Sequence, residues 1–356
     1  MLGERSLKEI SVAHVSLRDV AERSGVSFQT VSKVLNGEGR VAAATRQRIL
    51  DVAAELGYVP NSLARSLATR NSRTIGFIAS GLASFVLTPL MKGAEREARA
   101  RGYSMLFTLA EGDEEQAERL VHQLIERRVD GIVNAALTLQ QSRSYGDLLR
   151  RLAPSVSIFP VQGGGVPVVG EDPGTTGLLA TRHLLALGHR SVGTIAGDLD
   201  RPSSNGRLRG YQQALKEVGI EADPDLVDVG RWSADGGFEA MNRLLDRAPT
   251  ITAVFVHNDH MAIGAMRALY ERGLGVPEDC AIVGCDDIDL ARHIVPSLTT
   301  VRISFERSGE TAVRLLLDQI ASRELAPERL ILPVELVVRA SSGGAREIPS
   351  MSGQRG

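Results

Sequence analysis

The chain is poor in cysteine and has no long apolar segment. Cys280 and Cys285 are its only cysteines among 356 residues, and their spacing fits no common zinc-binding pattern and no disulfide framework. No apolar run approaches the ~18 residues that a membrane-spanning helix needs. The first ten residues, MLGERSLKEI, are charged and lack the apolar core of a secretory signal. We therefore expect a reduced protein in the cytoplasm.

Motifs of catalysis and cofactor binding are also missing. The sequence has no G-x-S-x-G motif, no P-loop and no G-x-G-x-x-G turn after an expected strand. The seven histidines are scattered and form no metal-binding pattern. His257 and His260 flank Asn258 and Asp259 and could contact a ligand, although capping of a helix start is the simpler interpretation. We therefore expect no enzymatic activity, no metal and no cofactor.

The net charge is only −2, but the charges are unevenly distributed. Residues 1–73 carry eleven Lys and Arg against seven Asp and Glu, a net charge of +4, whereas the rest of the chain has a net charge of −6. With 43% apolar residues, the chain is long enough for two or three domains with sizeable cores. The pattern predicts a basic, phosphate-binding head carried by an acidic body.

The segment from Leu17 to Asn36, LRDVAERSGVSFQTVSKVLN, is typical of two short helices joined by a tight turn. Ser16 and Asp19 have the spacing of a capping box, Gly25 supplies the left-handed turn, and Ser27 can cap the second helix. The outward-facing residues near the start of that helix are Phe28, Gln29, Thr30, Ser32 and Lys33. This pattern predicts a helix-turn-helix whose second helix enters the DNA major groove. An ordinary helical hairpin with a solvated face is the alternative.

Two more helical segments are expected before the body of the chain. The first spans Thr45–Leu56, and because Ala42 has no capping side chain we expect it to start late or to fray. The second, from Asn61 to about Thr69, has apolar residues at helical spacing but is too short to be stable alone. It therefore needs a partner, which is another chain, DNA or both, unless it is a plain linker.

From Thr74 onward, short apolar strands alternate with helices. This alternation predicts parallel sheets covered on both faces. There are too many units for one sheet, so we expect two similar doubly wound lobes with a break near Asp172–Thr175. The helix Phe305–Ser322 and the apolar run Leu330–Val338 come last, followed by a polar tail. Because ligands of such sheets bind beyond the carboxyl ends of the strands, the site is expected between the lobes.

Several motifs together resemble the lactose-repressor (LacI/GalR) family of bacterial transcription regulators, over roughly residues 16–339. They include VAERSGVSFQTVSKVLNG, TRQRILDVAAELGYVPNSLARSLAT, HLLALGHRSVGTIAG, GRLRGYQQAL, VFVHNDHMAIGAMRAL and SLTTVRISFERSGETAVRLLL. The resemblance implies a nucleoid-associated homodimer that binds a pseudo-palindromic operator. Its core would be of the type I periplasmic-binding-protein-like class and would bind a small effector.

The resemblance also implies a division of the chain into parts. These are a flexible N-terminal tail (1–15), the helix-turn-helix domain (16–60), a hinge helix with its linker (61–72), the core (73–340) and a disordered tail (341–356). Within the core, the N-lobe would comprise about 73–172 plus 305–332, and the C-lobe about 173–304 plus 333–340.

For DNA, the resemblance places Phe28, Gln29 and Thr30 at base-reading positions. Glutamine can bond adenine with two hydrogen bonds, and an aromatic ring can rest on a thymine methyl. Phosphate contacts are implied for Ser27, Thr30, Ser32, Asn36 and Arg46, beside the outward-facing Lys33. In the hinge, Leu67 matches a leucine that wedges into the minor groove and bends the duplex, with Asn61 and Ala64 beside it.

For the effector, the resemblance assigns to Arg207 the role of holding ligand oxygens, since spacing to Gly210 and Tyr211 favours it over Arg209. An arginine fork suits a pair of hydroxyls or a carboxylate. Trp232 would stack on a sugar ring. The full implied set is Ser80, Val86, Leu87, Asp172, Arg207, Trp232, Asn258, Asp286 and Phe305. Because Val86 and Leu87 stand where purine-specific relatives carry aromatics, a mono- or disaccharide is expected rather than a nucleobase.

Three departures from the family pattern and four alternative functions accompany this interpretation. Ile303 replaces a polar residue of the lactose repressor, Pro160 interrupts an acidic position, and tetramer-forming C-terminal heptads are absent, which favours a dimer. The regulator could be released by an inducer, as the sugar-like pocket favours, or could be a corepressor-dependent regulator or an activator. A solute-binding protein of the same core fold lacks support because of the DNA-reading head, and an enzyme lacks support because of the missing motifs.

Overall fold

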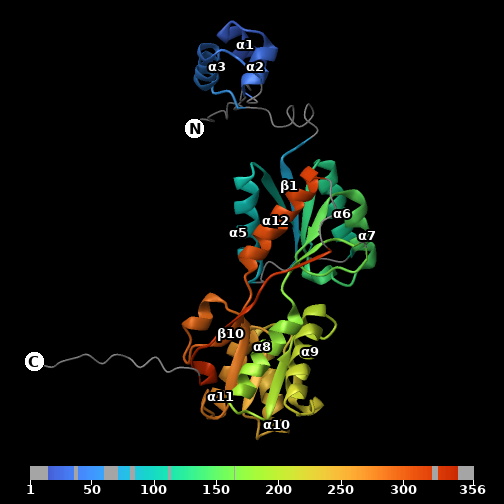
Figure 1. Ribbon diagram of the computed structural model, residues 1–356, viewed down its shortest axis with the longest axis vertical. Coiled ribbons are helices and arrows are strands. Elements are labelled where there is room, and N and C mark those ends of the chain that lie inside the picture. Colours follow the sequence, from blue (N-terminus) through green and yellow to red (C-terminus); the bar gives the residue numbers. More distant parts are fainter. Residues whose placement is uncertain are drawn as a thin grey trace, which may run out of the picture. The chain divides into compact units, whose positions relative to one another are not determined.

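The computed structural model describes residues 15–35, 39–59, 71–80, 85–110, 114–163, 165–322 and 328–343. The chain divides into two compact units, Met1–Ser72 and Arg73–Gly356. Figure 1 shows the elements of both units with their labels. Among the described residues, no helix has the length and apolar character needed to cross a membrane.

The first unit contains three short helices around a small apolar core. They are α1 (Leu17–Ser24), α2 (Phe28–Leu35) and α3 (Ala43–Glu55). Their buried residues form one cluster, which contains Val20, Ala21, Val31, Val34, Ile49 and Ala53. A core of this size needs good helix ends, because so few residues are removed from water.

The predicted capping of α1 and α2 is confirmed. The Ser16 backbone N–H donates to the Asp19 carboxylate at 2.7 Å, and the Asp19 N–H donates to Ser16 Oγ at 3.4 Å. Gly25 ends α1 with a φ of 67°, which glycine adopts without steric cost. Ser27 Oγ accepts the Thr30 N–H at 3.2 Å at the start of α2.

The expected late start of the third helix is wrong. Helix α3 begins at Ala43, and Ala42 occupies the N-cap position without a side-chain hydrogen bond. The Ala42 carbonyl still accepts the Arg46 N–H at 2.9 Å. Alanine has the highest helix propensity, and the buried Ile49 and Ala53 fix the helix in the core. Together these effects outweigh the missing cap.

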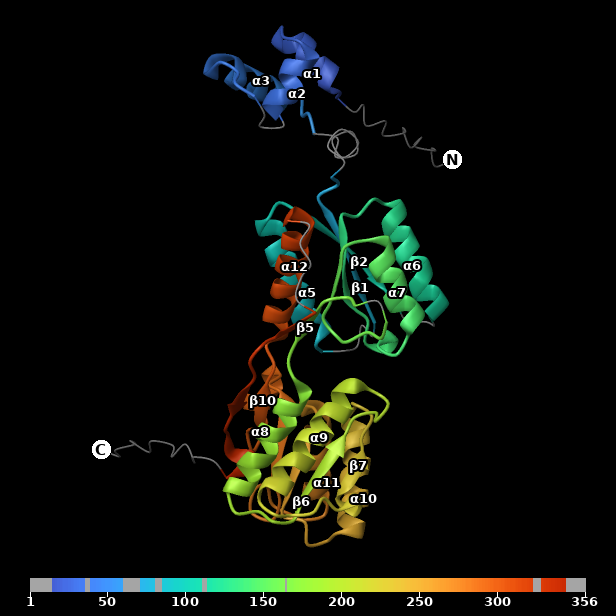
Figure 2. The same ribbon diagram turned by 45° about the vertical axis from the view of Figure 1, so that its right-hand side comes forward.

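The second unit contains two lobes, each built on its own sheet. In the first lobe the sheet order is β11-β5-β4-β3-β1-β2, and all of its pairs are parallel. Its strands are β1 (Thr74–Ala79), β2 (Ser104–Leu109), β3 (Gly131–Ala135), β4 (Ser155–Ser157), β5 (Val168–Gly170) and β11 (Arg329–Ile331). Helices α5 (Leu87–Ala100) and α12 (Phe305–Ser322) cover one face, while α6 (Glu114–Glu126) and α7 (Arg143–Leu152) cover the other (Figure 2).

The second lobe repeats this architecture. Its sheet order is β12-β10-β9-β8-β6-β7, and only β12 is antiparallel to its neighbour. The strands are β6 (Val192–Ala196), β7 (Val227–Val229), β8 (Ala253–Val256), β9 (Ala281–Asp286), β10 (Thr299–Arg302) and β12 (Glu335–Val337). Helices α8 (Pro173–Ala186) and α9 (Pro202–Glu217) pack on one face, and α10 (Ala234–Arg247) and α11 (Asp259–Glu271) on the other. The predicted pair of doubly wound lobes is confirmed.

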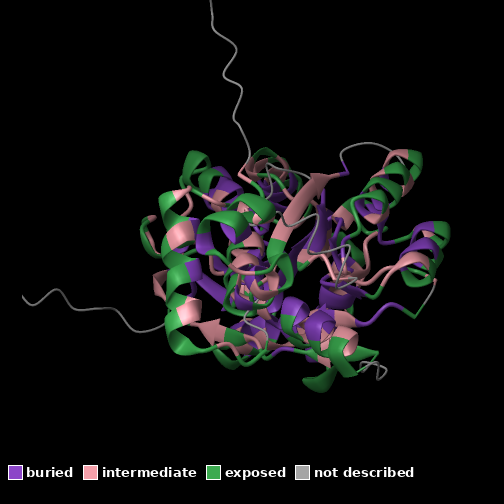
Figure 3. Ribbon diagram, turned by 90° about the horizontal axis from the view of Figure 1, so that it is seen from above, coloured by how far each residue is buried: buried purple, intermediate pink, exposed green. Residues whose placement is uncertain are grey.

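Burial follows this layering. Figure 3 shows buried residues gathered in the interior and exposed residues on the outward sides of the helices. The strands of such sheets lie between two helical layers, so their residues are apolar almost throughout. In β3, for example, every residue from Gly131 to Ala135 is buried.

Within the part of the core that the structure describes, three segments join the lobes. They run from β5 to α8, from β10 to α12, and from β11 to β12. The run Leu330–Val338 is therefore split between two sheets, with Pro333 in the connection. Ser341 lies after β12 and donates from Oγ to the Ile282 carbonyl at 2.7 Å. Residues 341–343 thus belong to the folded core and not to the predicted disordered tail, while the residues from 344 onward lie outside the described ranges.

Candidate functional site

The outward face of α2 carries the predicted DNA-reading residues. Gln29 and Lys33 are exposed, and Phe28 is 48% exposed although it is apolar. Thr30 and Ser32 are half-buried, while Val31 and Val34 of the same helix are buried in the core. The face therefore presents an apolar ring, an amide and a cation together, which is a combination that base edges and phosphates can use.

Two other predicted DNA residues are already engaged inside the first unit. Besides capping α2, the Ser27 hydroxyl lies 2.8 Å from Thr30 Oγ1. The Arg46 guanidinium donates to the Gly39 carbonyl at 3.5 Å. Asn36, Asn61, Ala64 and Leu67 lie outside the described residues, and so does the predicted hinge helix.

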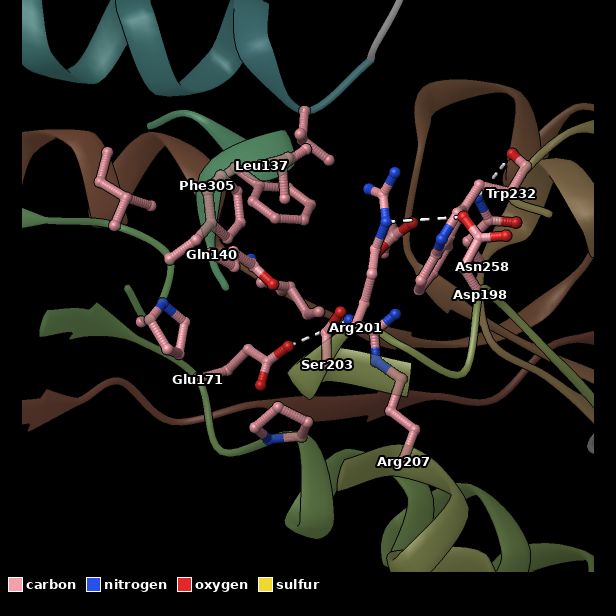
Figure 4. A pocket seen from close by; sticks show the side chains of 18 of the residues that line it. Leu137, Gln140, Glu171, Asp198, Arg201, Ser203, Arg207, Trp232, Asn258 and Phe305 are labelled. Atoms are coloured by element: carbon pink, nitrogen blue, oxygen red, sulfur yellow. Dashed lines mark hydrogen bonds and ion pairs between the residues drawn. The ribbon is translucent and has the colours of Figure 1, made fainter. Parts of the chain in front are cut away.

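A cavity of about 540 Å³ lies between the two lobes of the second unit (Figure 4). Both lobes and the segments that join them contribute to its wall. Seven of the nine predicted effector residues line it, namely Ser80, Val86, Arg207, Trp232, Asn258, Asp286 and Phe305. Ile303 and Pro160, noted above as departures from the lactose repressor, also line it.

Two predicted effector residues are not among the described residues that line the cavity. Leu87 is 4% exposed and belongs to the apolar core of the first lobe, where it begins α5. Asp172 caps α8, since its carboxylate accepts the Thr175 N–H at 3.0 Å and the Thr175 hydroxyl at 2.7 Å. The family resemblance placed both in the predicted set, but core packing uses the side chain of Leu87 and helix capping uses that of Asp172.

Arg207 of α9 forms a buried ion pair at the cavity with Glu171, which lies in the segment between β5 and α8. Its Nη2 lies 3.0 Å from Glu171 Oε1, and its Nη1 donates to the His257 carbonyl at 2.5 Å. Burial disfavours the guanidinium charge, but the attraction and hydrogen bond of the Glu171 carboxylate are among the effects that outweigh burial and raise the pKa of Arg207 above its usual value. Arg207 therefore stays charged and directs a fixed fork of N–H donors at the cavity.

Trp232 is held rigidly beside this ion pair. The Arg207 guanidinium lies 5.8 Å from the Trp232 ring centroid, and Asn258 Nδ2 donates to the Trp232 carbonyl at 3.2 Å. A Cβ atom on Gly197 would lie 2.1 Å from the indole ring, so only glycine permits this packing. Asn258 also caps α11 by accepting the Met261 N–H at 2.8 Å. Its amide thus positions Trp232 and α11, which is a different role from the predicted direct contact with the ligand.

Backbone strain gathers at the same edge of the second lobe. Arg231 and Trp232 have φ values of 50° and 66°, and Asp286 and Asp287 have φ values of 113° and 58°. Side chains other than glycine rarely adopt this region, and it costs free energy that the surrounding structure must supply. Such outliers cluster at ligand-binding sites, so their position supports the choice of this cavity as the site.

Burial favours the neutral forms of the acidic groups behind Arg207. Burial raises the pKa of Asp286 well above its ordinary value, partly offset by Arg207 and reinforced by Asp259. Burial likewise raises the pKa of Asp259 to about 7, although hydrogen bonds from Thr300 and the Ile288 N–H oppose the shift. A protonated Asp286 can donate a hydrogen bond to a ligand oxygen, which a carboxylate cannot do.

The first-lobe wall is mainly apolar and includes aromatic rings. Phe85 and Phe159 line the cavity together with Phe305, the first residue of α12. The Phe85 and Phe305 ring centroids are 6.4 Å apart, and Phe85 lies 4.6 Å from the His260 ring of the opposite lobe. The expectation that aromatic residues are absent around Val86 and Leu87 is therefore wrong, because Phe85, directly before Val86, lines the cavity.

Several lining residues were missed by the sequence reasoning. Glu171 is the direct neighbour of the predicted Asp172, and successive extended residues point in opposite directions. Arg201 pairs with Asp198 at 3.5 Å near the start of α9, and Gln140 follows a single turn of 3₁₀ helix, Leu137–Leu139. An acidic residue directly after a strand was a usable signal for Glu171, whereas the loop residues carried none. Figure 4 shows Gln140, Glu171, Arg201 and Arg207 around one space.

A helix-turn-helix unit and a two-lobed unit with an interlobe cavity, in one chain, define a DNA-binding regulator that responds to a small molecule. Residues 16–61 match the family model described as bacterial regulatory proteins, lacI family, and residues 181–342 match the periplasmic binding protein-like domain. The chain is 33% identical over 331 residues to the HTH-type transcriptional repressor PurR of Haemophilus influenzae (strain PittEE), covering 92% of the chain and 98% of that protein. It is 35% identical over 330 residues to the ribose operon repressor of Escherichia coli (strain K12), covering 92% and 99%. The chain belongs to the LacI family of bacterial regulatory proteins.

Solved structures agree with this assignment. The lac repressor dimer bound to operator and the anti-inducer ONPF aligns with a TM-score of 0.85 and 32% identity, over 92% of this chain and 99% of that one. The transcriptional regulator CelR in complex with cellobiose aligns with a TM-score of 0.70 and 35% identity, over 92% of this chain and 100% of that one. The predicted family and fold are thus confirmed.

Proposed function

We propose that this chain is a homodimeric transcriptional repressor that leaves a pseudo-palindromic operator when a mono- or disaccharide binds in the interlobe cavity. The observation that carries this proposal is the two-sided chemistry of the cavity. Arg207 and Asp286 of the second lobe and Glu171 of the β5–α8 segment offer polar groups, while Trp232 and the first-lobe wall offer apolar surface. A sugar has hydroxyls at its edge and apolar ring faces, so it complements both walls.

The relatives support the same conclusion. Two of them are named as repressors, one structure is of a dimer on operator DNA, and another holds cellobiose. A dimeric repressor with a sugar effector is therefore the proposal that agrees best with these relatives. The burial that keeps Cys285 and Asp286 neutral also supports binding of the ligand without chemical conversion, because neither group is activated as a nucleophile.

For DNA, we propose that Phe28, Gln29 and Thr30 read base edges and that Lys33 and Ser32 contact phosphates. Phosphate contacts position the head, and base contacts supply specificity. The hinge residues Asn61, Ala64 and Leu67 would act in the minor groove as the family resemblance implies. Leu67→Ala should then weaken operator binding strongly and leave sugar binding unchanged, and an equal loss of both would contradict this hinge role.

A second effector class is favoured by one specific observation. Phe85, Phe159 and Phe305 give the cavity enough aromatic surface for a flat heterocycle, such as a purine base. A regulator of that kind could bind its operator together with a corepressor. The direction of the effect on DNA binding therefore separates the two candidates.

The test uses the only tryptophan of the chain as a reporter, since Trp232 lies in the cavity wall. Its emission is titrated with D-ribose, D-glucose, D-galactose, cellobiose, lactose, hypoxanthine and guanine. Operator binding is followed by fluorescence anisotropy on labelled DNA from upstream of the chain's own gene, at several salt concentrations. We expect specific, salt-sensitive binding that a sugar weakens. Binding that a purine strengthens would favour the second candidate, and absence of specific binding would refute the repressor.

A further inference from the structure

Gln140 carries a buried amide at the first-lobe side of the cavity. The residue is 3% exposed and lines the cavity directly after the 3₁₀ turn Leu137–Leu139. Its main chain is fixed, because the Gln140 carbonyl accepts the Gln162 N–H at 2.9 Å. Figure 4 shows the side chain extending toward the part of the cavity where Glu171 and Arg207 meet.

The side-chain amide of Gln140 has no hydrogen-bond partner within the described ranges of the chain. Both Nε2 and Oε1 are buried and unpaired. A buried amide that makes no hydrogen bond destabilises the folded state, and native structures keep few such groups. The neighbouring Gln141, by contrast, donates to the Asp200 carbonyl of the opposite lobe. An unpaired amide at a cavity wall is best explained by a ligand that supplies the missing bonds.

The second lobe and the β5–α8 segment carry unpaired polar atoms of complementary kinds. Among the described residues, Glu171 Oε2, Arg207 Nε and Trp232 Nε1 are also buried without a partner. These atoms therefore offer one acceptor and two donors, and Gln140 offers one of each. The Ser80 hydroxyl of the first lobe already accepts the Thr138 N–H at 3.2 Å, whereas both polar atoms of the Gln140 side chain are unpaired among the described residues. Gln140 is thus the polar group of the first lobe best placed to read the ligand.

We propose that Gln140 is a specificity-determining residue that binds two neighbouring hydroxyls of the effector, donating to one and accepting from the other. Each hydroxyl can both donate and accept, so a diol matches the amide in one geometry. The bond would join the first lobe to a ligand held by Arg207 and Glu171, and so couple occupancy to the distance between the lobes. This inference rests on the proposed sugar effector, whose identity the experiment below tests first.

The experiment compares full-length wild type with Gln140→Met and Gln319→Met. Methionine keeps the length of the side chain and removes both hydrogen-bonding atoms. Gln319 is the matched control, because its Oε1 is likewise buried and unpaired among the described residues, yet it lies on α12 and is not one of the lining residues. Melting temperature is measured without ligand, and Trp232 emission is then titrated with D-ribose, D-glucose, D-galactose, cellobiose and lactose.

We expect Gln140→Met to melt at the wild-type temperature or above it, because no hydrogen bond is lost. The sugar that shifts wild-type emission should bind Gln140→Met at least about tenfold more weakly, since the truncated site leaves its hydroxyls unpaired. Gln319→Met should bind that sugar as wild type does. A deoxy analogue of the same sugar that lacks one of the two hydroxyls should bind wild type as weakly as the sugar binds Gln140→Met.

Three results would overturn the inference. A melting temperature of Gln140→Met several degrees below wild type would show that the amide has a structural partner. Equal sugar affinity for wild type and Gln140→Met would remove Gln140 from the site while leaving the sugar-responsive repressor intact. No response of wild type to any of the five sugars would reject the proposed effector class, and the role of Gln140 with it.

Discussion

Removing the charge of Arg207 should destabilise the core far more than removing the whole Arg207–Glu171 pair. Arg207→Met keeps the volume of the side chain and leaves Glu171 with a buried negative charge. The two side chains are 6% and 12% exposed, and their closest N–O distance is 3.0 Å. Glu171 Oε2 has no hydrogen-bond partner among the described residues, so little remains to stabilise its charge once the guanidinium is gone.

The expected magnitude follows from the cost of an uncompensated buried charge. Removing one partner of a buried ion pair typically costs about 3–5 kcal/mol, whereas replacing both by uncharged side chains is often neutral or better. We therefore expect Arg207→Met to lower the free energy of unfolding by about 3–5 kcal/mol. Adding Glu171→Gln to that variant should recover most of the loss, leaving a coupling energy of about 2 kcal/mol or more between the two positions.

The assay is urea denaturation of the full chain followed by far-ultraviolet circular dichroism. Trp232 emission is unsuitable here, because Arg207 lies over its ring and the substitution itself changes the signal. Wild type, both single variants and the double variant complete the cycle. Additive effects of the two single substitutions would refute the reasoning, because they would show that Arg207 and Glu171 act independently.

Three further predictions follow from the site and the head. Burial raises the pKa of Asp259 to about 7, so the folded state holds this proton more tightly than the unfolded state and stability falls as pH rises from about 3.9 to about 7. Asp259→Asn removes that dependence and should gain stability relative to wild type over the same window, as measured by urea denaturation at pH 5 and pH 8. Gly197→Ala places a Cβ 2.1 Å from the Trp232 ring and should shift its emission and weaken sugar binding by about tenfold or more, from an overpacking cost of about 1–3 kcal/mol. Gln29→Ala should cost about 1–3 kcal/mol of operator binding and relax specificity at one base pair, whereas Lys33→Ala should weaken all sequences alike and reduce the salt slope by about one unit in anisotropy titrations.

Matched controls and contrary results accompany these three predictions. Asp318→Asn changes an exposed carboxylate of α12 and should leave the pH profile unchanged. Gly275→Ala meets only the flexible side chains of Glu278 and Asp279, at 3.3 Å and beyond, and should not affect sugar binding. Parallel pH profiles of Asp259→Asn and wild type, or normal sugar binding by Gly197→Ala, would contradict the roles given to these residues. An unchanged salt dependence of operator binding in Lys33→Ala would likewise contradict the phosphate contact proposed for Lys33.

The features that the sequence predicts best are those formed by residues close together in the chain. The capping box of Ser16 and Asp19, the turn at Gly25 and the alternation of strands and helices all involve residues a few positions apart, and each is found in the structure. Arg207 also lines the cavity, but that expectation came from the family resemblance and not from local pattern. Predictions from local pattern can also fail. At Ala42 the missing N-cap side chain is outweighed by helix propensity and core packing, so α3 does not start late.

The features that the sequence predicts worst are contacts between residues that are far apart in the chain. Glu171 and Arg207 are 36 positions apart and belong to separate elements, the β5–α8 segment and α9, so their pairing depends on the tertiary fold. Asp172 was predicted as an effector residue and Glu171 was not considered, yet the start of α8 uses Asp172 as its cap. Gln140 gave no signal, because a polar residue in a loop is exposed in most proteins. Its burial depends on the packing of the turn before it and is visible only in three dimensions.

The last described residues complete both sheets of the core, and this affects how the chain is made. Strand β11 pairs with β5 in the first lobe, and β12 pairs with β10 in the second. On the ribosome, which adds residues in order, the helix-turn-helix residues emerge long before either lobe can be finished. A frameshift or stop codon ahead of residue 329 would leave β5 and β10 with open edges, which favour aggregation. Such a gene would still encode every residue of the described helix-turn-helix. Truncations in this part of the gene should therefore abolish ligand sensing and solubility although the DNA-reading residues are unchanged.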